Sequence, residues 1–472
     1  MSAEKAIETA QHVSQHEVSS GITYLFTFLL IAMILSLAFE EKIHAKKSLI
    51  VGIYAVIALI LGACLLPMPF GAVTLPNGHA IELPVYIPGI DWGVIAIIVG
   101  SSIFVDVTSR SGLFTWVAIK LTKASGGDPL ILLWFYGLMT IVFSAVLNNV
   151  TAMIIVGSLT GVSLKKLNRN NLLLGFLLIE GLLTNIGGLL TLISSVPNII
   201  VGNAANISFI TFFIKASPYV VVATIITIMM GAKLFGIKKL TTEEDRRIAK
   251  EEVSGFDEND GIESKAFFKF AAIVLGIFII TIASTSVLPY IKDLGMGFVA
   301  MAFATIMLIR FKSEVDQFYK SIDWDLIIFF MALFTVINVM EHADVLKLIG
   351  EGISWIIGSE ESAMGIGSLL VSSAFFSSVT DNIPLAAMLA KILTQLSTPE
   401  ASTLWWSVIF GANLGGNLTP IGSASTLVAV TIIHKYKLPM SFGGFVIKAL
   451  PFALVQIFIA TLYVLFVLPL FG

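Results

Sequence analysis

Charged side chains are scarce in this 472-residue chain, where Asp, Glu, Lys and Arg together make up only 12% of the residues. A soluble protein carries about 25% of such residues. Hydrophobic residues account for 57% of the chain, and its mean hydropathy is +0.94. This composition excludes a soluble globular domain and predicts a polytopic membrane protein.

Other absences narrow the function. The chain has no basic excess, because 31 acidic residues stand against 28 basic ones, and this argues against a nucleic-acid partner. The single cysteine, Cys64, lies in an apolar run, which excludes disulfides and thiolate metal sites. The motifs HExxH, GxSxG and GxxxxGK[ST] are missing. We therefore expect neither an enzyme nor an ATP-driven pump, and no cofactor apart from a coupling ion.

Apolar windows of membrane-spanning length are numerous. They fall near residues 21–39, 49–66, 92–109, 217–236, 266–287, 295–311, 324–340 and 444–470. Clusters of Lys and Arg separate many of them, and the largest cluster spans 233–265. Placing these clusters in the cytoplasm predicts about ten spans in the cytoplasmic (inner) membrane. The polar tail 1–20 and the C-terminus then lie outside, and 237–265 is a cytoplasmic linker.

Four further apolar stretches are too long or too interrupted for one plain span. Stretch 129–163 has basic residues at both ends, whereas 363–397 has acidic or neutral flanks. Each fits two half-crossings that turn back, so we expect two re-entrant hairpins. Stretches 171–210 and 403–432 are interrupted by glycine, asparagine and hydroxyl residues, which are poor helix formers. These stretches are expected to be broken transmembrane helices.

The two halves of the chain repeat each other. "IDWGVIAIIVGSSIF" from Ile90 matches "IDWDLIIFFMALFTV" from Ile322, and "SAVLNNVTAM" matches "SSVTDNIPLAAM". "TNIGGLLTLISSVPN" from Thr184 matches "ANLGGNLTPIGSAST" from Ala412. The charge pattern gives the matching spans opposite directions, so residues 21–236 and 266–472 form an inverted-topology repeat. Such repeats with interrupted helices indicate the binding site of a secondary transporter.

The interruptions themselves predict a binding site, because non-helical backbone within a membrane needs protein or water to satisfy it. Broken helices aim N–H and C=O groups at the gap, while Asn and Thr add ligand oxygens. The alternative is that the glycine pairs only permit close helix packing. The candidate site residues of the first half are Asn148, Asn149, Thr151, Thr184, Asn185, Gly187, Gly188, Thr191, Ser195 and Asn198. Those of the second half are Thr380, Asp381, Asn382, Asn413, Gly415, Gly416, Asn417, Thr419, Pro420, Ser423 and Ser425.

Two carboxylates within apolar stretches are candidates for coupling, since an acid inside the bilayer is costly. Asp381 lies at the tip of the second hairpin, where it is expected to carry Na⁺ or H⁺ or to cap the second arm. Glu180 lies one helical turn before Thr184, either as a coupling residue or as a protonated packing residue. Asp106 and Arg110 fit an ordinary interfacial ion pair. Sodium ligands are expected at Asn149, Asn185, Asp381 and Asn413.

These motifs make the chain similar to the ion transporter superfamily, in the branch of arsenite permeases, D-type sodium–proton antiporters and the melanosomal P protein. The branch is related to divalent anion:sodium symporters. The likeness covers roughly residues 21–470 and is carried by "LNNVTAM", "TNIGGLLTLISSVPN", "DNIP" and "GGNLTPIGSAS". It implies a homodimer in lipid and elevator-like alternating access coupled to Na⁺ or H⁺. Relatives of the P-protein kind often carry Asp-Asn where this chain has Asn148-Asn149, so the two sites need not be equivalent.

Several functions remain open from the sequence. The leading interpretation is a cation-coupled secondary transporter that performs Na⁺/H⁺ antiport or the efflux of an ion or arsenite. Helix N-termini favour the alternative, a Na⁺-coupled transporter of a small organic anion such as a dicarboxylate or citrate. An ion channel and an intramembrane enzyme are the rival classes. The substrate is accordingly expected to be a small inorganic ion or a small organic anion.

Overall fold

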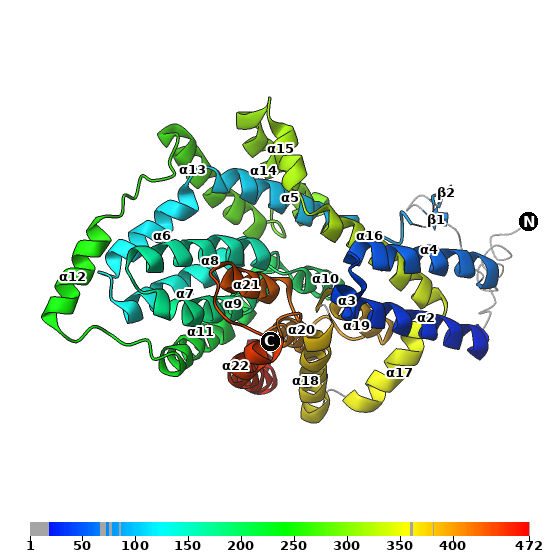
Figure 1. Cartoon of the computed structure of the whole chain (residues 1–472). Coiled ribbons are helices and arrows are strands. Elements are labelled where there is room, and N and C mark those ends of the chain that lie inside the picture. Colours follow the sequence, from blue (N-terminus) through cyan, green and yellow to red (C-terminus); the bar gives the residue numbers. More distant parts are fainter. Residues whose placement is uncertain are drawn as a thin grey trace, which may run out of the picture. The chain divides into compact units, whose positions relative to one another are not determined.

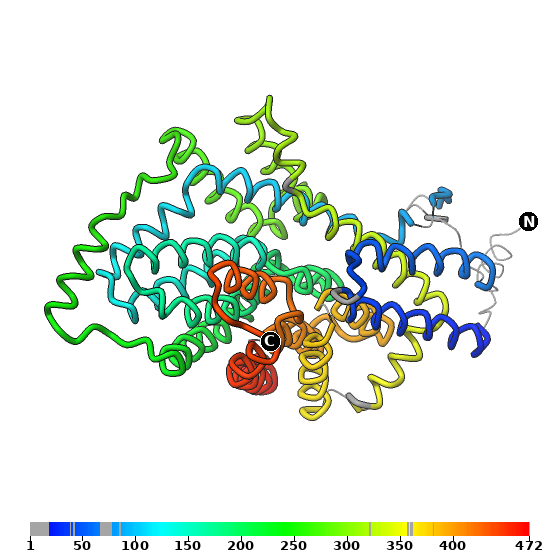
Figure 2. The backbone as a smooth tube through the Cα atoms, in the orientation of Figure 1, coloured from blue at the N-terminus to red at the C-terminus, as the bar shows by residue number. Residues whose placement is uncertain are grey.

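The computed structural model describes residues 18–66, 72–74, 78–84, 86–358, 362–380 and 382–471, and nearly every element in them is a helix (Figures 1 and 2). The residues group into two compact units. The first comprises the described residues up to Asp91 together with Ile328–Ile349, and the second comprises Trp92–Ile327 together with the described residues from Gly350 onward.

The first unit is built around two apolar helices that pack together, α2 (Ser20–Ala38) and α4 (Lys47–Leu65), which the short α3 (Glu40–Ile43) joins. The Ser36 and Tyr54 hydroxyls form a hydrogen bond of 2.8 Å between them. Strands β1 (Ala72–Thr74) and β2 (Ala80–Glu82) pair antiparallel, with Val73 opposite Ile81. Most of α16 (Trp324–His342) and the start of α17 (Val345–Ile357) also belong to this unit.

The second unit contains the helices that carry the predicted site. In chain order they are α5 (Trp92–Ser109), α6 (Leu113–Ala124), α7 (Pro129–Val146), α8 (Asn149–Lys166), α9 (Leu173–Gly187), α10 (Val196–Ala204), α11 (Phe209–Leu234), α12 (Glu243–Ser254), α13 (Lys265–Ala283), α14 (Ile291–Leu308), α15 (Val315–Ser321), α18 (Ala363–Val379), α19 (Asn382–Gln395), α20 (Thr403–Gly415), α21 (Ala424–Lys435) and α22 (Phe442–Leu462). A π-helical turn, Tyr463–Val467, and a 3₁₀ turn, Leu468–Phe471, follow α22.

Each predicted hairpin is a pair of helices with a short break between the arms. In the first, α7 and α8 are separated by Leu147 and Asn148. The Asn148 side chain accepts a hydrogen bond from the Thr151 N–H at 2.8 Å and so caps α8. In the second, α18 ends at Val379 and α19 begins at Asn382.

Each predicted broken helix is interrupted over eight residues, 188–195 between α9 and α10 and 416–423 between α20 and α21. Pro197 stands in the first turn of α10, where its missing N–H leaves no hydrogen bond unmade. Ser423 caps α21 by accepting a hydrogen bond from the Thr426 N–H. The predicted fold class is confirmed: the protein is an all-α polytopic membrane protein with an inverted repeat, two hairpins and two broken helices.

Matching hydrogen bonds tie each hairpin to the broken helix of its own half. The first arm of each hairpin donates a serine hydroxyl to a carbonyl oxygen in the first part of the broken helix, and the interruption donates a threonine hydroxyl back to that arm. The four bonds are Ser144 to Thr184 (2.6 Å), Ser377 to Ala412 (2.6 Å), Thr191 to Ala145 (2.5 Å) and Thr419 to Ser378 (2.5 Å). These are equivalent positions of the repeat.

The packing of helices follows the same symmetry. Helix α7 packs on α9 as α18 packs on α20, and these contacts lie within one half. Helix α10 packs on α19 and α21 packs on α8, so the second part of each broken helix contacts the hairpin of the other half (Figure 1). The two halves are therefore interlocked within the second unit.

The glycine that ends the first part of each broken helix permits close approach to the hairpin. A Cβ atom at Gly187 would lie 2.9 Å from the Cα atom of Ile141, and one at Gly415 would overlap the Ala374 carbonyl oxygen. Small residues that allow such backbone contact are typical of membrane helices. The structure thus gives these glycines a packing role.

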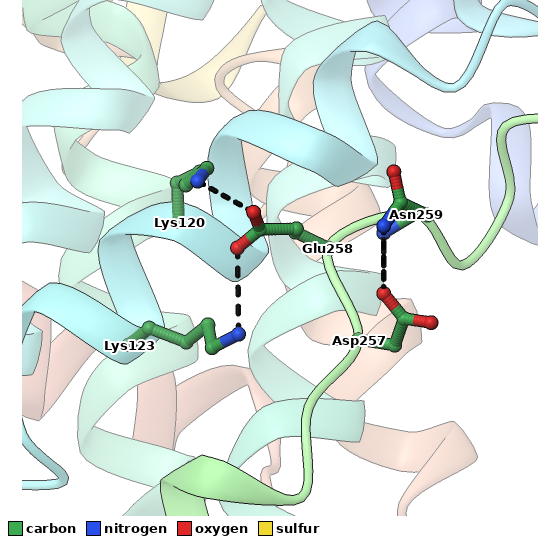
Figure 3. Close-up of polar contacts among 5 residues, drawn as sticks. All are labelled: Lys120, Lys123, Asp257, Glu258 and Asn259. Carbon is green, nitrogen blue, oxygen red and sulfur yellow. Dashed lines mark hydrogen bonds and ion pairs between the residues drawn. The ribbon is translucent and has the colours of Figure 1, made fainter. Parts of the chain in front are cut away.

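Part of the predicted linker, 237–265, docks on the end of α6 (Figure 3). The Glu258 carboxylate contacts the Lys120 Nζ at 2.6 Å and the Lys123 Nζ at 3.4 Å. The hydrogen bond from Lys120 is the largest cause that lowers the pKa of the Glu258 carboxyl below its usual value, and Lys123 adds to it. Next to it, the Asp257 carboxylate accepts hydrogen bonds from the Asn259 backbone and side-chain N–H groups.

Among the described residues, ten helices are long and apolar enough to cross a membrane. Helix α7 is one of them, although the sequence predicts it to be a hairpin arm. Length and composition alone therefore do not separate a hairpin arm from a full crossing. The number nevertheless fits an integral multi-pass membrane protein.

The close contact at Gly415 predicts a stability effect. We expect Gly415→Ala to lower the free energy of unfolding by about 1–3 kcal/mol, because the added methyl group forces α20 away from α18. Reversible unfolding by SDS in mixed micelles measures this. The control is Gly276→Ala on α13, where an added Cβ meets no atom within 4 Å. Equal stability of the two variants would contradict the close contact.

The lowered pKa of Glu258 predicts a pH dependence of linker docking. Because the folded state lowers this pKa, the contact stabilises docking above the usual carboxyl pKa and is lost as the pH falls through the lowered value. We expect Glu258→Gln to speed amide hydrogen exchange in α12 at neutral pH, with Glu263→Gln, an exposed acid of the same segment, as the control. Identical exchange in wild type and Glu258→Gln would show that Lys120 and Lys123 do not hold the linker.

Candidate functional site

A cavity of about 460 Å³ lies within the second unit, at the tips of both hairpins and at both interruptions. Several predicted site residues line it, namely Asn148, Asn149, Thr151, Asn185, Ser195, Asn382, Ser423 and Ser425. They come from positions far apart in the sequence, so the fold brings together the matched motifs that the repeat identifies.

Four helices begin at this cavity. The first residue of each, Asn149 of α8, Val196 of α10, Asn382 of α19 and Ala424 of α21, lines its wall. A helix N-terminus carries backbone N–H groups without helical partners and a partial positive charge. Four such ends around one cavity create a site that favours a negatively charged group.

The charged side chains of the cavity have the opposite sign. Asp106 on α5 and Asp323 before α16 line it, and its described lining residues include no Lys or Arg. Asp106 lies 3.9 Å from Arg110, as the predicted interfacial ion pair requires. The Asp323 carboxylate accepts a hydrogen bond from the Leu326 N–H at 3.0 Å. Positive potential at this cavity thus comes from backbone N–H groups, whereas its side chains supply hydroxyls, amides and carboxylates.

Asn185, at the end of α9, connects the cavity to a buried hydrogen-bond network. Its amide nitrogen donates to Asn417 Oδ1 at 2.8 Å and to Ser423 Oγ at 3.0 Å. Its amide oxygen accepts from Ser425 at 3.0 Å and from Asn149 Nδ2 at 3.5 Å. Every polar atom of this side chain therefore has a partner in the structure.

Asn413 is the equivalent residue of the second half and makes related contacts. Its amide oxygen accepts a hydrogen bond from Ser195 at 2.7 Å, and its nitrogen donates to Asn198 Oδ1 at 2.8 Å. Asn198 in turn donates to the Gly188 and Thr191 carbonyl oxygens. Asn185 is thus hydrogen-bonded to Ser423, and Asn413 is hydrogen-bonded to Ser195. In each case the serine stands just before the second part of the broken helix of the other half. The amide oxygens of Asn149, Asn185 and Asn413, which are expected to bind Na⁺, each accept a hydrogen bond here, so that assignment stays a prediction.

The network extends to two residues that the sequence did not identify. Asn417 donates to the Gln456 Oε1 of α22 at 2.8 Å, and Gln456 Nε2 donates to the Thr227 hydroxyl of α11 at 2.9 Å. Gln456 is the one amide side chain of α22 and lies in the apolar run between Pro451 and Ala460, and this isolated polar residue was the available signal. Since all three side chains are buried, the network fixes the interruption of the second half against α11 and α22.

Polar residues of α5 were also missed. Ser102, Asp106 and Ser109 line the cavity. They are spaced four and three residues apart and so share one face of the helix. The equivalent positions of the matched segment from Ile322 are Phe334, Asn338 and Glu341, so the polar face is only partly repeated there. The ion pair with Arg110 explains Asp106 without a binding site, and the sequence therefore did not assign this face to the cavity.

The remaining predicted residues lie apart from the cavity wall. Gly187 and Gly415 lie close to the backbone of the hairpin arms, and Gly188 and Gly416 lie close to the Asn149 and Ser423 side chains. The residues that hold the interruptions through hydrogen bonds are Thr184, Thr191, Thr419, Asn198, Asn413 and Asn417. The Thr380 hydroxyl bonds the Phe376 carbonyl oxygen, and the Pro420 carbonyl oxygen accepts from Thr426. Asp381, the predicted coupling residue, lies outside the described residues.

Comparison with known proteins identifies the family. The family model described as "Citrate transporter" (CitMHS) matches residues 49–411 of the chain. The chain belongs to the citrate transporter family. A "46 kDa membrane protein" of Mycobacterium leprae is 30% identical over 381 residues, which cover 79% of this chain and 86% of that protein. An "uncharacterized transporter" of Mycobacterium tuberculosis matches with the same identity and coverage.

More distant relatives agree with the resemblance drawn from the motifs. The mouse P protein is 24% identical over an alignment that covers 97% of this chain and 65% of the P protein. The crystal structure of the YdaH transporter of Alcanivorax borkumensis matches with a TM-score of 0.59 at 12% identity, covering 89% of this chain and 98% of that one. This last likeness concerns the fold alone. Together the relatives place this citrate transporter family member among transporters of the ion transporter type.

The asparagines that end the half-helices predict a loss of transport. We expect Asn185→Ala and Asn413→Ala each to abolish substrate flux in proteoliposomes, because each variant removes the amide that holds an interruption open toward the cavity. Asn203→Ala, an exposed asparagine of α10, is the control. Size-exclusion profiles and reversible unfolding identify a variant that has merely lost its fold. Wild-type flux in either folded variant would refute the site.

Proposed function

We propose that this member of the citrate transporter family is a secondary active transporter that binds a small carboxylate anion in the cavity and couples its movement to Na⁺ or H⁺. The observation that carries this proposal is the convergence of four helix N-termini on one cavity. Carboxylate oxygens accept hydrogen bonds from the N–H groups that remain uncapped at such ends, and the helix dipoles favour their charge. The name of the matching family supports citrate as the first substrate to test.

The size of the cavity supports the same proposal. Its volume of about 460 Å³ is within the range of small-molecule sites, roughly 300–1,000 Å³. Hydroxyl groups of Ser195, Ser423 and Ser425 on its wall suit the carboxylate and hydroxyl groups of a polar organic anion. The sequence alone ranked this function second, and the converging N-termini now favour it over cation exchange.

A cation fits beside the anion. The Asp106 and Asp323 carboxylates and the amide oxygen of Asn382 line the same cavity. Hard cations prefer such oxygen ligands, and a bound cation would offset the repulsion between an anionic substrate and these acids. Asp381, which precedes Asn382 at the hairpin tip, remains our candidate for carrying the coupling ion.

A second candidate function is Na⁺/H⁺ antiport or ion efflux without an organic substrate. It is favoured by the two aspartates on the cavity wall and by the lack of Lys and Arg among the described lining residues. An anion transporter often holds its substrate with a cationic side chain. A cavity wall with acids and without such a cation therefore also supports cation exchange.

Alternating access by an elevator movement is part of the proposal. Hydrogen bonds and packing join both hairpins and both broken helices into one body, which supports their movement as a unit. We further propose, on the family likeness, a homodimer in the cytoplasmic membrane. The charge distribution supports both termini outside and the 237–265 segment in the cytoplasm.

Uptake of radiolabelled citrate into proteoliposomes tests the function. We expect saturable uptake that an inward Na⁺ or H⁺ gradient accelerates, because the anion and the coupling ion occupy the cavity together. Non-saturating current indicates a channel. Exchange of Na⁺ for H⁺ without citrate movement indicates the second candidate.

The coupling role of Asp381 is tested in the same vesicles. Asp381→Asn keeps the size and the hydrogen bonding of the side chain but removes its charge, so gradient-driven uptake should fail while the protein remains folded. Asp293→Asn, an exposed acid on α14, is the control. Unaltered dependence on both gradients in Asp381→Asn places the coupling site elsewhere.

A further inference from the structure

Glu180 is a carboxylate in the middle of α9 with no exposed surface. One of its oxygens, Oε1, accepts a hydrogen bond from the Thr160 hydroxyl of α8 at 2.6 Å. The other, Oε2, is buried and has no hydrogen-bond partner. The helix around it is apolar, and residues 175–187 of α9 are all buried.

An ionised carboxylate in these surroundings would lack the partners that such a charge requires. Buried charges are normally paired or bound to a metal, and an unpaired acid neutralises instead. A sodium ion fits poorly, because a hard cation takes about six oxygen ligands and the hydrogen bonds here supply one neighbouring side-chain oxygen. A proton on Oε2 requires no further ligand.

The charged groups of the helices packed on α9 leave Glu180 without a cationic partner. Those helices are α7, α8, α11, α20 and α21. Tyr136 on α7 is the titratable side chain that interacts electrostatically with Glu180. The basic residues Lys165 and Lys166 end α8, Lys233 ends α11, and His434 and Lys435 end α21. On α11, Lys215 lies in the second turn, and the Tyr219 hydroxyl bonds the Gln456 carbonyl oxygen. Helix α20 carries no titratable residue.

Buried hydroxyl groups continue from Glu180 along α8. Thr160 is one helical turn before Ser163, whose hydroxyl forms a hydrogen bond of 2.8 Å with the Tyr136 hydroxyl. Tyr136 forms another of 2.8 Å with Thr122 of α6. On the other side, Glu180 is one turn before Thr184, whose carbonyl oxygen lies 2.6 Å from Ser144 Oγ. The same Ser144 Oγ lies 2.7 Å from Asn149 Oδ1 at the cavity.

We propose that Glu180 is a proton-binding site of this transporter, separate from the substrate cavity, and that its proton is coupled to transport in addition to the ion expected at Asp381. In each cycle one proton binds Oε2 from one side of the membrane and leaves from the other, while Thr160 keeps its hydrogen bond to Oε1. The hydroxyl groups of Thr160, Ser163, Tyr136 and Thr122 mark the route toward α6. This inference rests on the proposed function for its coupling role, whereas the protonation itself can be observed without transport.

Infrared difference spectroscopy of the full-length protein in liposomes tests protonation first. We expect the wild type to show a carboxylic-acid C=O band that shifts in D₂O, disappears as the pH rises, and is absent from Glu180→Gln. Thr160→Val should move the band to higher frequency, because the carbonyl Oε1 loses its hydrogen bond. Glu400→Gln, an exposed acid, is the control and should keep the band. A spectrum without a band from Glu180, or a band insensitive to pH wherever the protein stays folded, overturns the proposal.

Uptake of radiolabelled citrate then tests coupling. Glu180→Gln should bind and exchange citrate across the membrane but lose the acceleration by an inward H⁺ gradient. If Glu180→Gln keeps this acceleration, Glu180 is only a protonated packing residue and the proposal is wrong. If the wild type moves no citrate, the proposed substrate fails, and the infrared titration still decides whether Glu180 exchanges a proton with the bulk solvent.

Discussion

Backbone N–H and C=O groups that lose their helical hydrogen bonds at a helix break need other partners inside an apolar protein. The structure of the rest of the site depends on which groups supply these hydrogen bonds. At each interruption a side chain of the following half-helix donates a hydrogen bond to the carbonyl oxygen of the interruption's first residue, at equivalent positions of the two halves. Asn198 bonds the Gly188 oxygen at 2.6 Å, and Thr426 bonds the Gly416 oxygen at 3.2 Å. Burial without such partners would cost several kcal/mol per group. With these two carbonyl oxygens satisfied internally, the first residues of the following helices, Val196 and Ala424, lie on the cavity wall.

This arrangement separates two kinds of residue within one motif. Asn413, Asn417 and Thr419 are occupied in holding the interruption together, whereas Ser423 and Ser425 lie on the cavity wall. A substitution in the first group changes the shape of the site, and one in the second group changes its chemistry. The two halves therefore share a framework without having to share a ligand, since Leu189 and Pro197 replace the Asn417 and Ser425 of the second half.

The sequence was sufficient to predict the hairpins, the interruptions and the residues near them, because two imperfect copies of a motif reveal which features both copies need. It also placed Asn149 and Asn382 at one site, and both line the cavity. It could not separate wall residues from supporting ones, since an asparagine that binds a carbonyl oxygen and one that faces a cavity look alike in sequence. Gln456 was missed because it lies outside the matched motifs. Asp323 lies within the matched segment from Ile322, but its place on the cavity wall arises only from the fold.

The exchange of contacts between the halves has a consequence for biosynthesis. Helix α10 packs on α19, which the ribosome synthesises much later. Helix α8 packs on α21, which is separated from it by an even longer stretch of chain. Until the second half is inserted, the first has an interrupted segment and a hairpin arm whose polar groups lack their final neighbours. The order of insertion into the membrane and the order of tertiary assembly therefore differ. A nascent chain of this protein must be held in the bilayer, half-assembled, until its last third arrives.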